Sequence, residues 1–290
     1  MATAAQWLEG ARPRTLPAAI APVAAGTGAA ALAGGFIAWK AVLALLVALA
    51  LQVGVNYAND YSDGVRGTDA ERVGPLRLVG SGLARAPDVR NAALASFAVA
   101  GVIGLVLALT TAWWLLLVGA ACVVAAWFYT GGRRPYGYRG LGEVSVFVFF
   151  GLVATVGTTF VQVEEFTTVS VLAGSGCGAL ACAILVANNL RDLETDRAAG
   201  KHTLAVRLGD RGTRWFYVML LVAAFLALAA IGAIHVPALA VLITVLPATR
   251  CARAVLGGAR GRELVPVLKM TGSVLLLYGV LLGGALALNR

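Results

Sequence analysis

Charged residues are scarce in this sequence. They make up 13% of its 290 residues, whereas hydrophobic residues make up 60%. Soluble globular proteins carry about 25% charged and about 45–50% apolar residues. With half the usual charge, the chain cannot cover the surface of a soluble body of this size. This excludes an ordinary cytosolic enzyme, a disordered protein and a nucleic-acid-binding domain, and it predicts a helical protein with several membrane spans.

The sequence also has few of the side chains that bind transition metals or act as nucleophiles. It holds two histidines, His202 and His235, and four cysteines. The cysteines lie in or beside apolar stretches without CxxC spacing, so we interpret them as small buried residues. There is no Walker A loop and no dinucleotide fingerprint. Zinc, P-loop and nicotinamide chemistry are therefore excluded as first hypotheses.

Long apolar stretches dominate what is present. Each is near the ~20 residues with which a helix crosses ~30 Å of hydrocarbon. They predict an all-α integral membrane protein of nine transmembrane helices in a single domain, residues 1–290. The stretches are 15–34, 36–58, 91–110, 112–130, 143–163, 168–188, 214–233, 236–256 and 265–288. The break near His235 is weak, so a count that differs by one stays open.

Basic residues are distributed unevenly around these stretches. Of the 23 lysines and arginines, all but Lys40, Lys269 and Arg290 lie near the N-terminus or in the segments 59–90, 131–142, 189–214 and 250–264. Because positive residues mark the cytoplasmic side, we expect the N-terminus and these loops inside and the C-terminus outside. The net charge of +9 is thus explained by orientation in the membrane, with no nucleic-acid partner.

An acidic segment, GVNYANDYSDGVRGTD, closes the second apolar stretch. It contains Asn56, Asn59, Asp60, Asp63 and Asp69. If the helix continues through Asp63, the first four side chains share one face. Carboxylates at the end of a membrane helix are costly unless they are paired, hydrated or metal-bound. Oxygen ligands of this kind suit Mg²⁺; the alternative is a solvated helix end capped by Asn and Asp.

A second acidic segment, VANNLRDLETDRAAGKHTLAVRLG, closes the sixth stretch. It repeats the pattern with Asn188, Asn189, Asp192 and Asp196. Two acids four residues apart point the same way from a helix. Both acidic segments lie on the same predicted side of the membrane. Facing each other across a bundle, they are suited to hold two Mg²⁺ ions bridged by a diphosphate.

Basic and aromatic residues accompany these acids. Arg77, Arg191 and Lys201 have the chemistry to grip phosphate oxygens, although any cytoplasmic loop is expected to be basic. A third segment, YTGGRRPYGYRGLGE, holds three tyrosines and Arg139. Their rings are suited to wall a site for an isoprenoid cation, or else form an interfacial aromatic belt. The tyrosines are Tyr129, Tyr136 and Tyr138.

Taken together, NDYSDGVRGTD and NNLRDLETD resemble the two aspartate-rich motifs of the UbiA superfamily of intramembrane prenyltransferases. Four further blocks are similar to the menaquinone branch of that family, in its actinobacterial form. They are ARPRTLPAAIAPVAAGT, RVGPLRLVGSG, RPYGYRGLGE and GKHTLAVRLG. The resemblance runs from about residue 7 to residue 210 and weakens through the last three stretches.

The resemblance implies a fold and an activity. The fold is a UbiA-like bundle around a central cavity that opens to the cytoplasmic side of a bacterial plasma membrane. The activity is Mg²⁺-dependent transfer of a polyprenyl group from polyprenyl diphosphate to 1,4-dihydroxy-2-naphthoate. Carbon dioxide and diphosphate leave, and demethylmenaquinone is formed.

The resemblance also assigns roles to residues. Metal ligands are Asn59, Asp63, Asp192 and Asp196. Gly67 stands where the family pattern NxxxDxxxD has its last acid, so Asp60 or Asp69 completes the first metal site. Catalytic roles are expected for Asp63, Asp69, Asp192, Asp196, Lys201 and Tyr138. Substrate contacts are expected from Asn56, Asn59, Arg77, Arg139, Asn188, Asn189, Arg191, Tyr129, Tyr136 and Arg14.

Other functions compete with this one. Within the family, the acceptor is instead 4-hydroxybenzoate, haem or a chlorophyllide. Outside it, an ion-coupled transporter also uses intramembrane carboxylates and broken helices. The acids here lie at helix ends beside arginines rather than near the bilayer midplane, which favours the enzyme. A membrane scaffold would leave the paired acidic segments unexplained.

Overall fold

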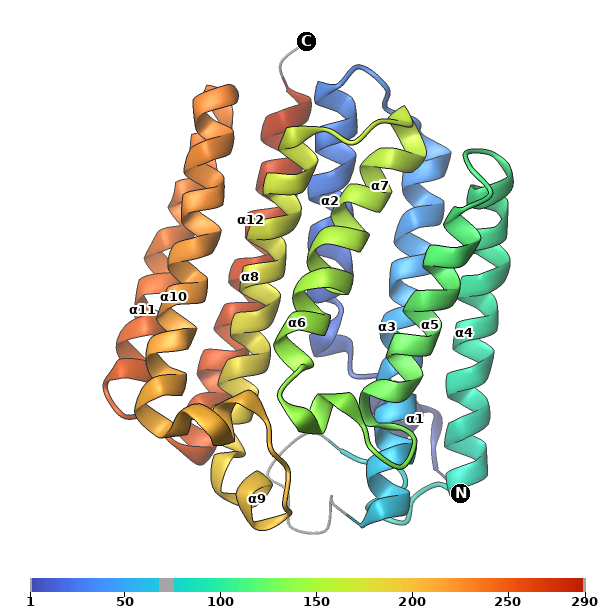
Figure 1. Ribbon diagram of the computed structural model, residues 1–290, viewed down its shortest axis with the longest axis vertical. Coiled ribbons are helices and arrows are strands. Elements are labelled where there is room, and N and C mark those ends of the chain that lie inside the picture. The colour runs from blue at the N-terminus through green and yellow to red at the C-terminus, as the bar shows by residue number, and fades with distance from the viewer. Residues whose placement is uncertain (1, 68–75, 289–290) are drawn as a thin grey trace.

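The protein is a bundle of helices that run along its long axis (Figure 1). The computed structural model describes residues 2–67 and 76–288, and these contain no strand. The longer helices are α2 (Pro17–Leu32), α3 (Ala38–Arg66), α4 (Ala86–Leu109), α5 (Leu115–Thr130), α8 (Thr168–Arg191), α10 (Leu204–Ile234), α11 (Val245–Leu256) and α12 (Leu264–Ala287). The all-α prediction is confirmed for this part of the chain.

Shorter segments complete or connect these helices. One apolar stretch is built from three of them in succession: α6 (Gly142–Val146), the π-helical Phe147–Val153 and α7 (Ala154–Val163). The remaining segments are α1 (Ala4–Gly10), α9 (Leu193–Ala198) and the 3₁₀ turns Pro13–Thr15, Tyr136–Arg139, Val236–Thr244 and Gly261–Glu263. Each of the nine predicted apolar stretches coincides with a helical region.

Fewer helices are long and apolar enough to span a membrane than there are helical stretches. In the described residues seven helices are long and apolar enough to cross a membrane. An eighth is added if the bent pair Ala4–Thr15 and Pro17–Leu32, with 49° between its halves, forms one span. Helix α5 is apolar but has only 16 residues. Nine spans therefore stays a prediction.

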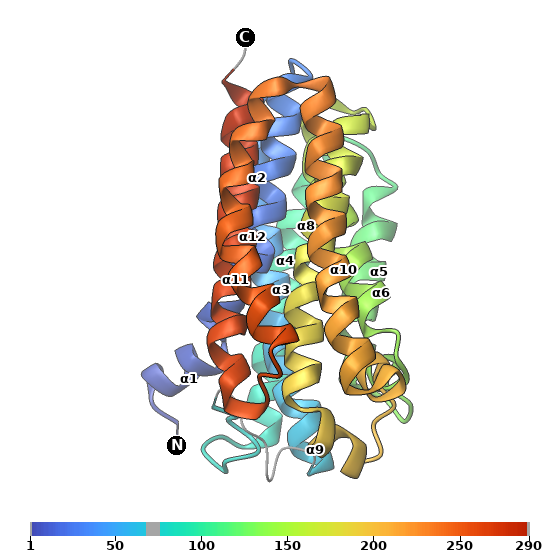
Figure 2. The same ribbon diagram turned by 90° about the vertical axis from the view of Figure 1, so that its left-hand side faces the viewer.

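Two groups of helices form separate hydrophobic cores, and α2 lies between them. Helices α8, α10, α11 and α12 form the main hydrophobic core together with α2. Helices α3 and α4 pack against each other in a second, smaller core around Tyr57 and Phe97. Figures 1 and 2 show α2 lying between the two groups, beside α12 and near α7. Side chains from both groups therefore face a common interior.

Glycine allows the closest helix contacts. A Cβ added to Gly28 of α2 would lie 2.4 Å from the carbonyl oxygen of Gly283 on α12. A Cβ on Gly151, in the π-helical segment, would lie 2.5 Å from the Cα of Gly178 on α8. Such separations are far below van der Waals contact. These glycines bring the backbones together as small residues do in membrane bundles.

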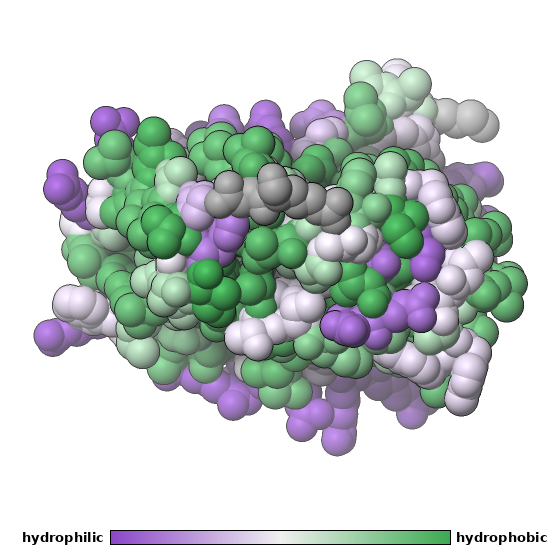
Figure 3. All heavy atoms as spheres, turned by 90° about the horizontal axis from the view of Figure 1, so that it is seen from above, coloured by the Kyte–Doolittle hydropathy of each residue, from purple (hydrophilic) through white to green (hydrophobic). Residues whose placement is uncertain are grey.

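The segments with polar functional residues gather at one end of the bundle. Figure 1 shows α1, α9, the turn between α5 and α6 and the end of α3 at the end opposite the C-terminus. The face carrying the C-terminus, seen in Figure 3, is covered largely by apolar residues. Helix α3 continues about two turns past the predicted stretch, through Asp63 to Arg66, and ends at Gly67 with a φ of 71°.

Candidate active site

A cavity of about 490 Å³ lies inside the bundle. It is lined by residues from α2, α3, α4, α5, the segment α6–α7, α8 and α12, and by the region around α9. At one end the lining is polar, with Asn59, Asp63, Arg77, Asp196 and Lys201. Elsewhere it is mostly apolar, with residues such as Leu107, Val118, Phe149 and Val161. A cavity with this division suits a molecule with a charged head and a long apolar tail.

Helix α3 contributes one continuous polar stripe. Gln52, Asn56, Asn59 and Asp63 follow each other at spacings of four, three and four residues, and all line the cavity. The Nδ2 of Asn56 donates to the Thr15 Oγ1 and to the Ala11 carbonyl, both at 2.8 Å. The Nε2 of Gln52 donates to the same Thr15 oxygen at 3.0 Å. Sequence reasoning missed Gln52, although its spacing from Asn56 could have identified it.

Asp60 does not belong to that stripe. It is fully buried, and its two carboxylate oxygens accept from the backbone amides of Leu78 and Val79 at 2.7 and 3.1 Å. Within the described chain it is not among the cavity-lining residues. The prediction of one shared face for all four residues is therefore wrong for Asp60, which lies about 100° around the helix from Asn59. Asp60 holds the backbone that follows Arg77.

Asp69, the other candidate for the first metal site, lies outside the described residues.

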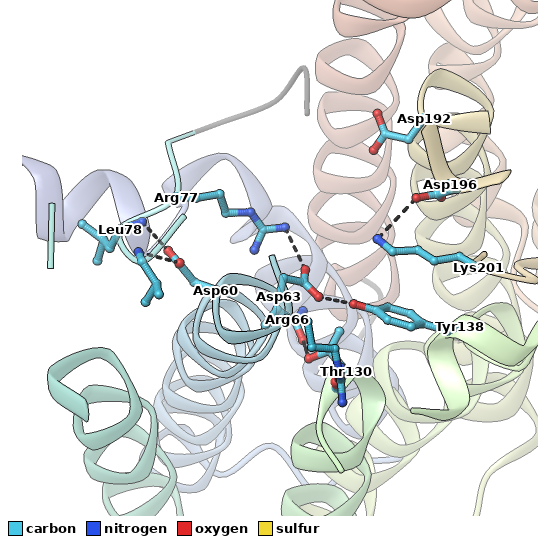
Figure 4. Close-up of polar contacts among 12 residues, drawn as sticks. Asp60, Asp63, Arg66, Arg77, Leu78, Thr130, Tyr138, Asp192, Asp196 and Lys201 are labelled. Atoms are coloured by element: carbon cyan, nitrogen blue, oxygen red, sulfur yellow. Dashed lines mark hydrogen bonds and ion pairs between the residues drawn. The ribbon is translucent and has the colours of Figure 1, made fainter. Parts of the chain in front are cut away.

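Asp63 connects the first acidic segment to the third segment. Its carboxylate accepts from the Tyr138 hydroxyl and from the Arg77 Nη2, the latter at 3.3 Å. Figure 4 shows Asp63 between these two side chains, which come from different loops. Asn59, one turn earlier, accepts a hydrogen bond of 2.8 Å from the Thr130 hydroxyl at the end of α5. Segments more than sixty residues apart are thus joined at the end of α3.

Tyr138 also connects the third segment to the second acidic segment. The Lys201 Nζ lies 4.7 Å from the centroid of the Tyr138 ring. The same nitrogen lies 3.3 Å from the Asp196 Oδ1. Asp63, Tyr138, Lys201 and Asp196 therefore form a chain of contacts across the polar end of the cavity (Figure 4). Sequence reasoning placed all four in the site but not in this order.

The second acidic segment lies at a break between two helices. Helix α8 ends at Arg191, Asp192 follows it, and α9 begins at Leu193. Arg191 donates to both Asp192 carboxylate oxygens at 2.7 Å. Asn188, Asn189, Arg191 and Asp196 line the cavity, whereas Asp192, which is 4% exposed, is not among the described lining residues.

The donor atoms of the site suit a hard cation. In the described ranges, no three Asp, Glu, His or Cys side chains gather closely enough to hold a metal by themselves. Basic side chains stand against Asp63, Asp192 and Asp196 instead. Mg²⁺ is bound through one or two carboxylates plus substrate phosphates, and phosphate oxygens also attract arginine and lysine. The residues present fit Mg²⁺ that is bound together with a diphosphate.

Two tyrosines of the third segment line the cavity wall. The rings of Tyr129 and Tyr136 meet edge to face, with centroids 5.5 Å apart. The Tyr136 hydroxyl donates to the Ala125 carbonyl at 2.7 Å and lies 2.9 Å from the Ser145 Oγ. Burial raises the pKa of Tyr136, so its hydroxyl stays protonated and keeps this bond. These rings form a rigid wall rather than an exposed belt.

Two predicted arginines differ in their placement. Arg14 is exposed but contributes to the cavity lining. Arg139 has an exposed side chain that is not part of the described lining, and its carbonyl accepts a 2.8 Å bond from the Arg207 Nη2. The structure therefore does not place Arg139 on the cavity wall, and its substrate contact stays a prediction. Its backbone instead connects the third segment to the start of α10.

Comparison with known proteins identifies the family. Residues 19–265 match the UbiA prenyltransferase family. The chain belongs to this family. The match spans most of the chain and confirms the resemblance seen in the acidic segments.

Relatives of known name cover most or all of the chain. The 1,4-dihydroxy-2-naphthoate octaprenyltransferase of Mycobacterium tuberculosis is 54% identical, over 100% of this chain and 99% of the relative. The protein of the same name in Escherichia coli is 40% identical over 77% of this chain and 75% of its own length.

Solved structures of UbiA homologues show the fold. A homologue from Archaeoglobus fulgidus bound to DMAPP and Mg²⁺ has a TM-score of 0.71 and 14% identity, covering 98% of this chain and all of that chain. The apo homologue from Aeropyrum pernix has a TM-score of 0.69 and 17% identity, covering 92% and 96%.

Proposed function

We propose that this protein transfers a polyprenyl group from polyprenyl diphosphate to 1,4-dihydroxy-2-naphthoate, with loss of carbon dioxide and diphosphate, to give demethylmenaquinol, the reduced form of demethylmenaquinone. The observation that carries the proposal is the contact chain from Asp63 through Tyr138 and Lys201 to Asp196, at the polar end of a long apolar cavity. The name of the relatives at 52–54% identity supports the acceptor.

The diphosphate is bound at the polar end. Arg77 and Lys201 donate to its oxygens, as both already contact carboxylates there. Asn59, Asp63, Asp192 and Asp196 would hold Mg²⁺, in our proposal two ions bridged by the diphosphate, with Asp69 as a further candidate ligand. When bound, Mg²⁺ neutralises charge that develops on the departing diphosphate. The solved homologues bound to DMAPP or GPP with Mg²⁺ support this use of the site.

The polyprenyl chain extends along the apolar part of the cavity. There the lining excludes water, which protects a cation-like allylic carbon from hydrolysis. The Tyr138 ring, already under the Lys201 ammonium, is suited to face that carbon by cation–π attraction once the lysine turns to the phosphate. The naphthoate ring attacks the allylic carbon, and the carbon that carried the carboxylate then loses carbon dioxide.

The acceptor carboxylate is bound near the start of α2. Arg14 lines the cavity there and offers a bidentate donor for a carboxylate. Thr15 is held in place by Gln52 and Asn56, which orients this part of the wall. Tyr129 and Tyr136 provide flat surfaces for an aromatic ring.

The site opens to the cytoplasm of a bacterial cell whose plasma membrane the protein spans. The distribution of basic residues supports this sidedness, because the loops that carry them lie at the same end of the bundle as the polar part of the cavity. Both the lipid-tailed substrate and the product then stay in the bilayer.

The test uses purified protein in detergent or nanodiscs. It is incubated with Mg²⁺, 1,4-dihydroxy-2-naphthoate and prenyl diphosphates of several lengths, and products are measured by mass spectrometry together with released carbon dioxide. We expect prenylated, decarboxylated naphthoquinol and no product in excess EDTA. Prenylation of 4-hydroxybenzoate or a porphyrin in its place would contradict the proposed acceptor. Solute flux in proteoliposomes without prenyl transfer would overturn the activity.

A further inference from the structure

Glu143 is a buried acid with unusual surroundings. Its side chain is 5% exposed, in the first turn of α6. The other buried acids of the described chain accept from paired backbone amides, as Asp60 does, or contact arginine or lysine. Among the described residues no ion pair joins Glu143 to a basic side chain. A buried carboxylate normally has such a partner, so this arrangement needs another explanation.

The polar contacts of Glu143 are made to α8. Its Oε1 accepts from the Asn189 Nδ2 at 3.1 Å. The Cys182 Sγ lies 3.1 Å from its carbonyl oxygen. One residue is thus attached to α8 through both its side chain and its backbone. The packing of α6 against α8 therefore determines where Glu143 lies relative to Asn189.

Glu143 determines the orientation of the Asn189 amide. The hydrogen bond runs from the Asn189 Nδ2 to the Glu143 Oε1, so the nitrogen of the amide points at Glu143. The amide oxygen, Oδ1, is then the atom left for other partners. Asn189 lines the cavity, as do Leu185, about one turn earlier on α8, and Tyr129. The wall therefore offers a fixed acceptor oxygen among apolar and aromatic groups.

The Glu143 carboxylate behind the Asn189 amide determines which chemical groups bind well at this part of the wall. A carboxylate behind a carbonyl oxygen repels a diphosphate and favours a hydroxyl group that donates a hydrogen bond. The cations at the polar end of the cavity, such as Arg77 and Lys201, have the opposite preference. One cavity thus presents separate positions for a phosphate head and for a hydroxyl on an aromatic ring.

We propose that the Asn189 Oδ1 accepts a hydrogen bond from a ring hydroxyl of the aromatic acceptor, and that Glu143 is the positioning residue that makes this possible. The inference rests on the proposed function, since it takes the hydroxynaphthoate as acceptor. A hydroxyl that donates to such an oxygen gains electron density, which passes to the ring carbon that attacks. The proton stays on its own oxygen throughout.

The test compares two ligands that differ only in their hydroxyl groups. Dissociation constants are measured for 1,4-dihydroxy-2-naphthoate and for 2-naphthoate, which has the same rings and carboxylate. The variants are Glu143→Leu, Asn189→Leu and the isosteric Glu143→Gln. We expect the two leucine variants to bind the dihydroxy compound about tenfold more weakly, as for one lost hydrogen bond, and 2-naphthoate equally well. Glu143→Gln gives a smaller loss, because its amide no longer dictates the orientation of Asn189.

Controls separate this role from a general structural one. Glu165→Gln, at an exposed position between α7 and α8, should bind both naphthoates as the unaltered protein does. Binding of a prenyl diphosphate with Mg²⁺ should be unchanged in every variant, and steady-state kinetics should show a raised KM for the naphthoate alone. Equal losses for both naphthoates, or no loss for either, would overturn the role of Glu143.

The proposed function is tested separately by the unaltered protein. If it forms the prenylated naphthoate while Glu143→Leu binds the dihydroxy compound normally, the inference fails and the function stands. If it forms no such product from any prenyl diphosphate, the function fails and the inference fails with it.

Discussion

The two acidic segments are similar in sequence but are built differently. In the first, α3 continues without a break through Asp60 and Asp63, so the two acids point in different directions. In the second, α8 ends at Arg191 and the chain turns at Asp192 before α9 carries Asp196. In a continuous helix the directions of two acids are fixed by their spacing along the helix. At a break between two helices the chain turns, so each acid can point in a direction of its own.

The partners of these acids differ as well. Asp192 is held by Arg191, its neighbour in the chain, and Asp196 by Lys201, five residues later. Asp60 accepts from the backbone of Leu78 and Val79, and Asp63 contacts Arg77 and Tyr138. In these contacts the acids of the second segment are held by residues close in sequence, whereas Asp60 and Asp63 contact parts of the chain 14 to 75 residues away. This comparison predicts that damage to the first segment spreads further through the site.

The largest loss of turnover is expected when one carboxylate is removed from either acidic segment. Asp63→Ala and Asp192→Ala should each lower turnover at least about 10³-fold, because metal-assisted charge neutralisation contributes several kcal/mol to the transition state. Product formation by mass spectrometry measures this. Asp88→Ala, an exposed acid in the first turn of α4, is the matched control. Near-normal turnover in either site variant would remove that segment from the metal site.

Loss of the lysine between the segments should have the next largest effect. Lys201→Ala is expected to lower kcat about 10²-fold, as removal of one donor to a developing negative charge does elsewhere. Lys201→Arg should recover part of this activity, since the charge is retained. Steady-state kinetics with varied prenyl diphosphate measures both. If alanine and arginine variants behaved alike, the charge of Lys201 would not contribute.

A smaller effect is expected from the hydroxyl that joins the segments. Tyr138→Phe removes the bond to Asp63 but keeps the ring beneath Lys201. One such bond contributes about 1 kcal/mol, which corresponds to a fall in turnover of about tenfold or less. Tyr138→Leu should lose more, because the ring is lost too. Equal activity of the two variants would show that the ring itself is dispensable.

The smallest effect on turnover is expected at Asp60, where stability is lost instead. Asp60→Asn removes one of the two oxygens that accept backbone amides, leaving a buried donor unsatisfied. We expect about 1–3 kcal/mol less stability toward unfolding. Thermal denaturation in detergent gives this value, with turnover normalised to folded protein. A stable but inactive Asp60→Asn would instead place Asp60 in the metal site.

Much of the site was predictable because helices have a fixed period. Once α3 is extended to Asp63, the spacing of Asn56, Asn59 and Asp63 places them on one face, and the structure confirms this. The same reasoning applied to Asp60 was wrong. Asp60 follows Asn59 directly, and one residue turns an α-helix by about 100°. This rotation points the Asp60 side chain at the loop of residues 77–79 instead of the cavity.

Other placements required contacts between distant segments. Nothing near Tyr138 in the sequence indicates that its hydroxyl reaches Asp63 while its ring faces Lys201. Arg139, next along the chain, has an exposed side chain, and only its backbone is used. Glu143 was not among the site residues predicted from the sequence, because nothing local places its carboxylate beside Asn189 of α8.

The sequence by itself determined that the chain is a membrane bundle and that its scarce acids cluster in two segments among basic loops. Composition and helical period suffice for this, because both are local properties. Only the tertiary structure decided which acids face the cavity, which cations hold them and which tyrosine joins the two segments. Those outcomes depend on how helices rotate and where loops return, and both are determined by packing between residues far apart in the chain.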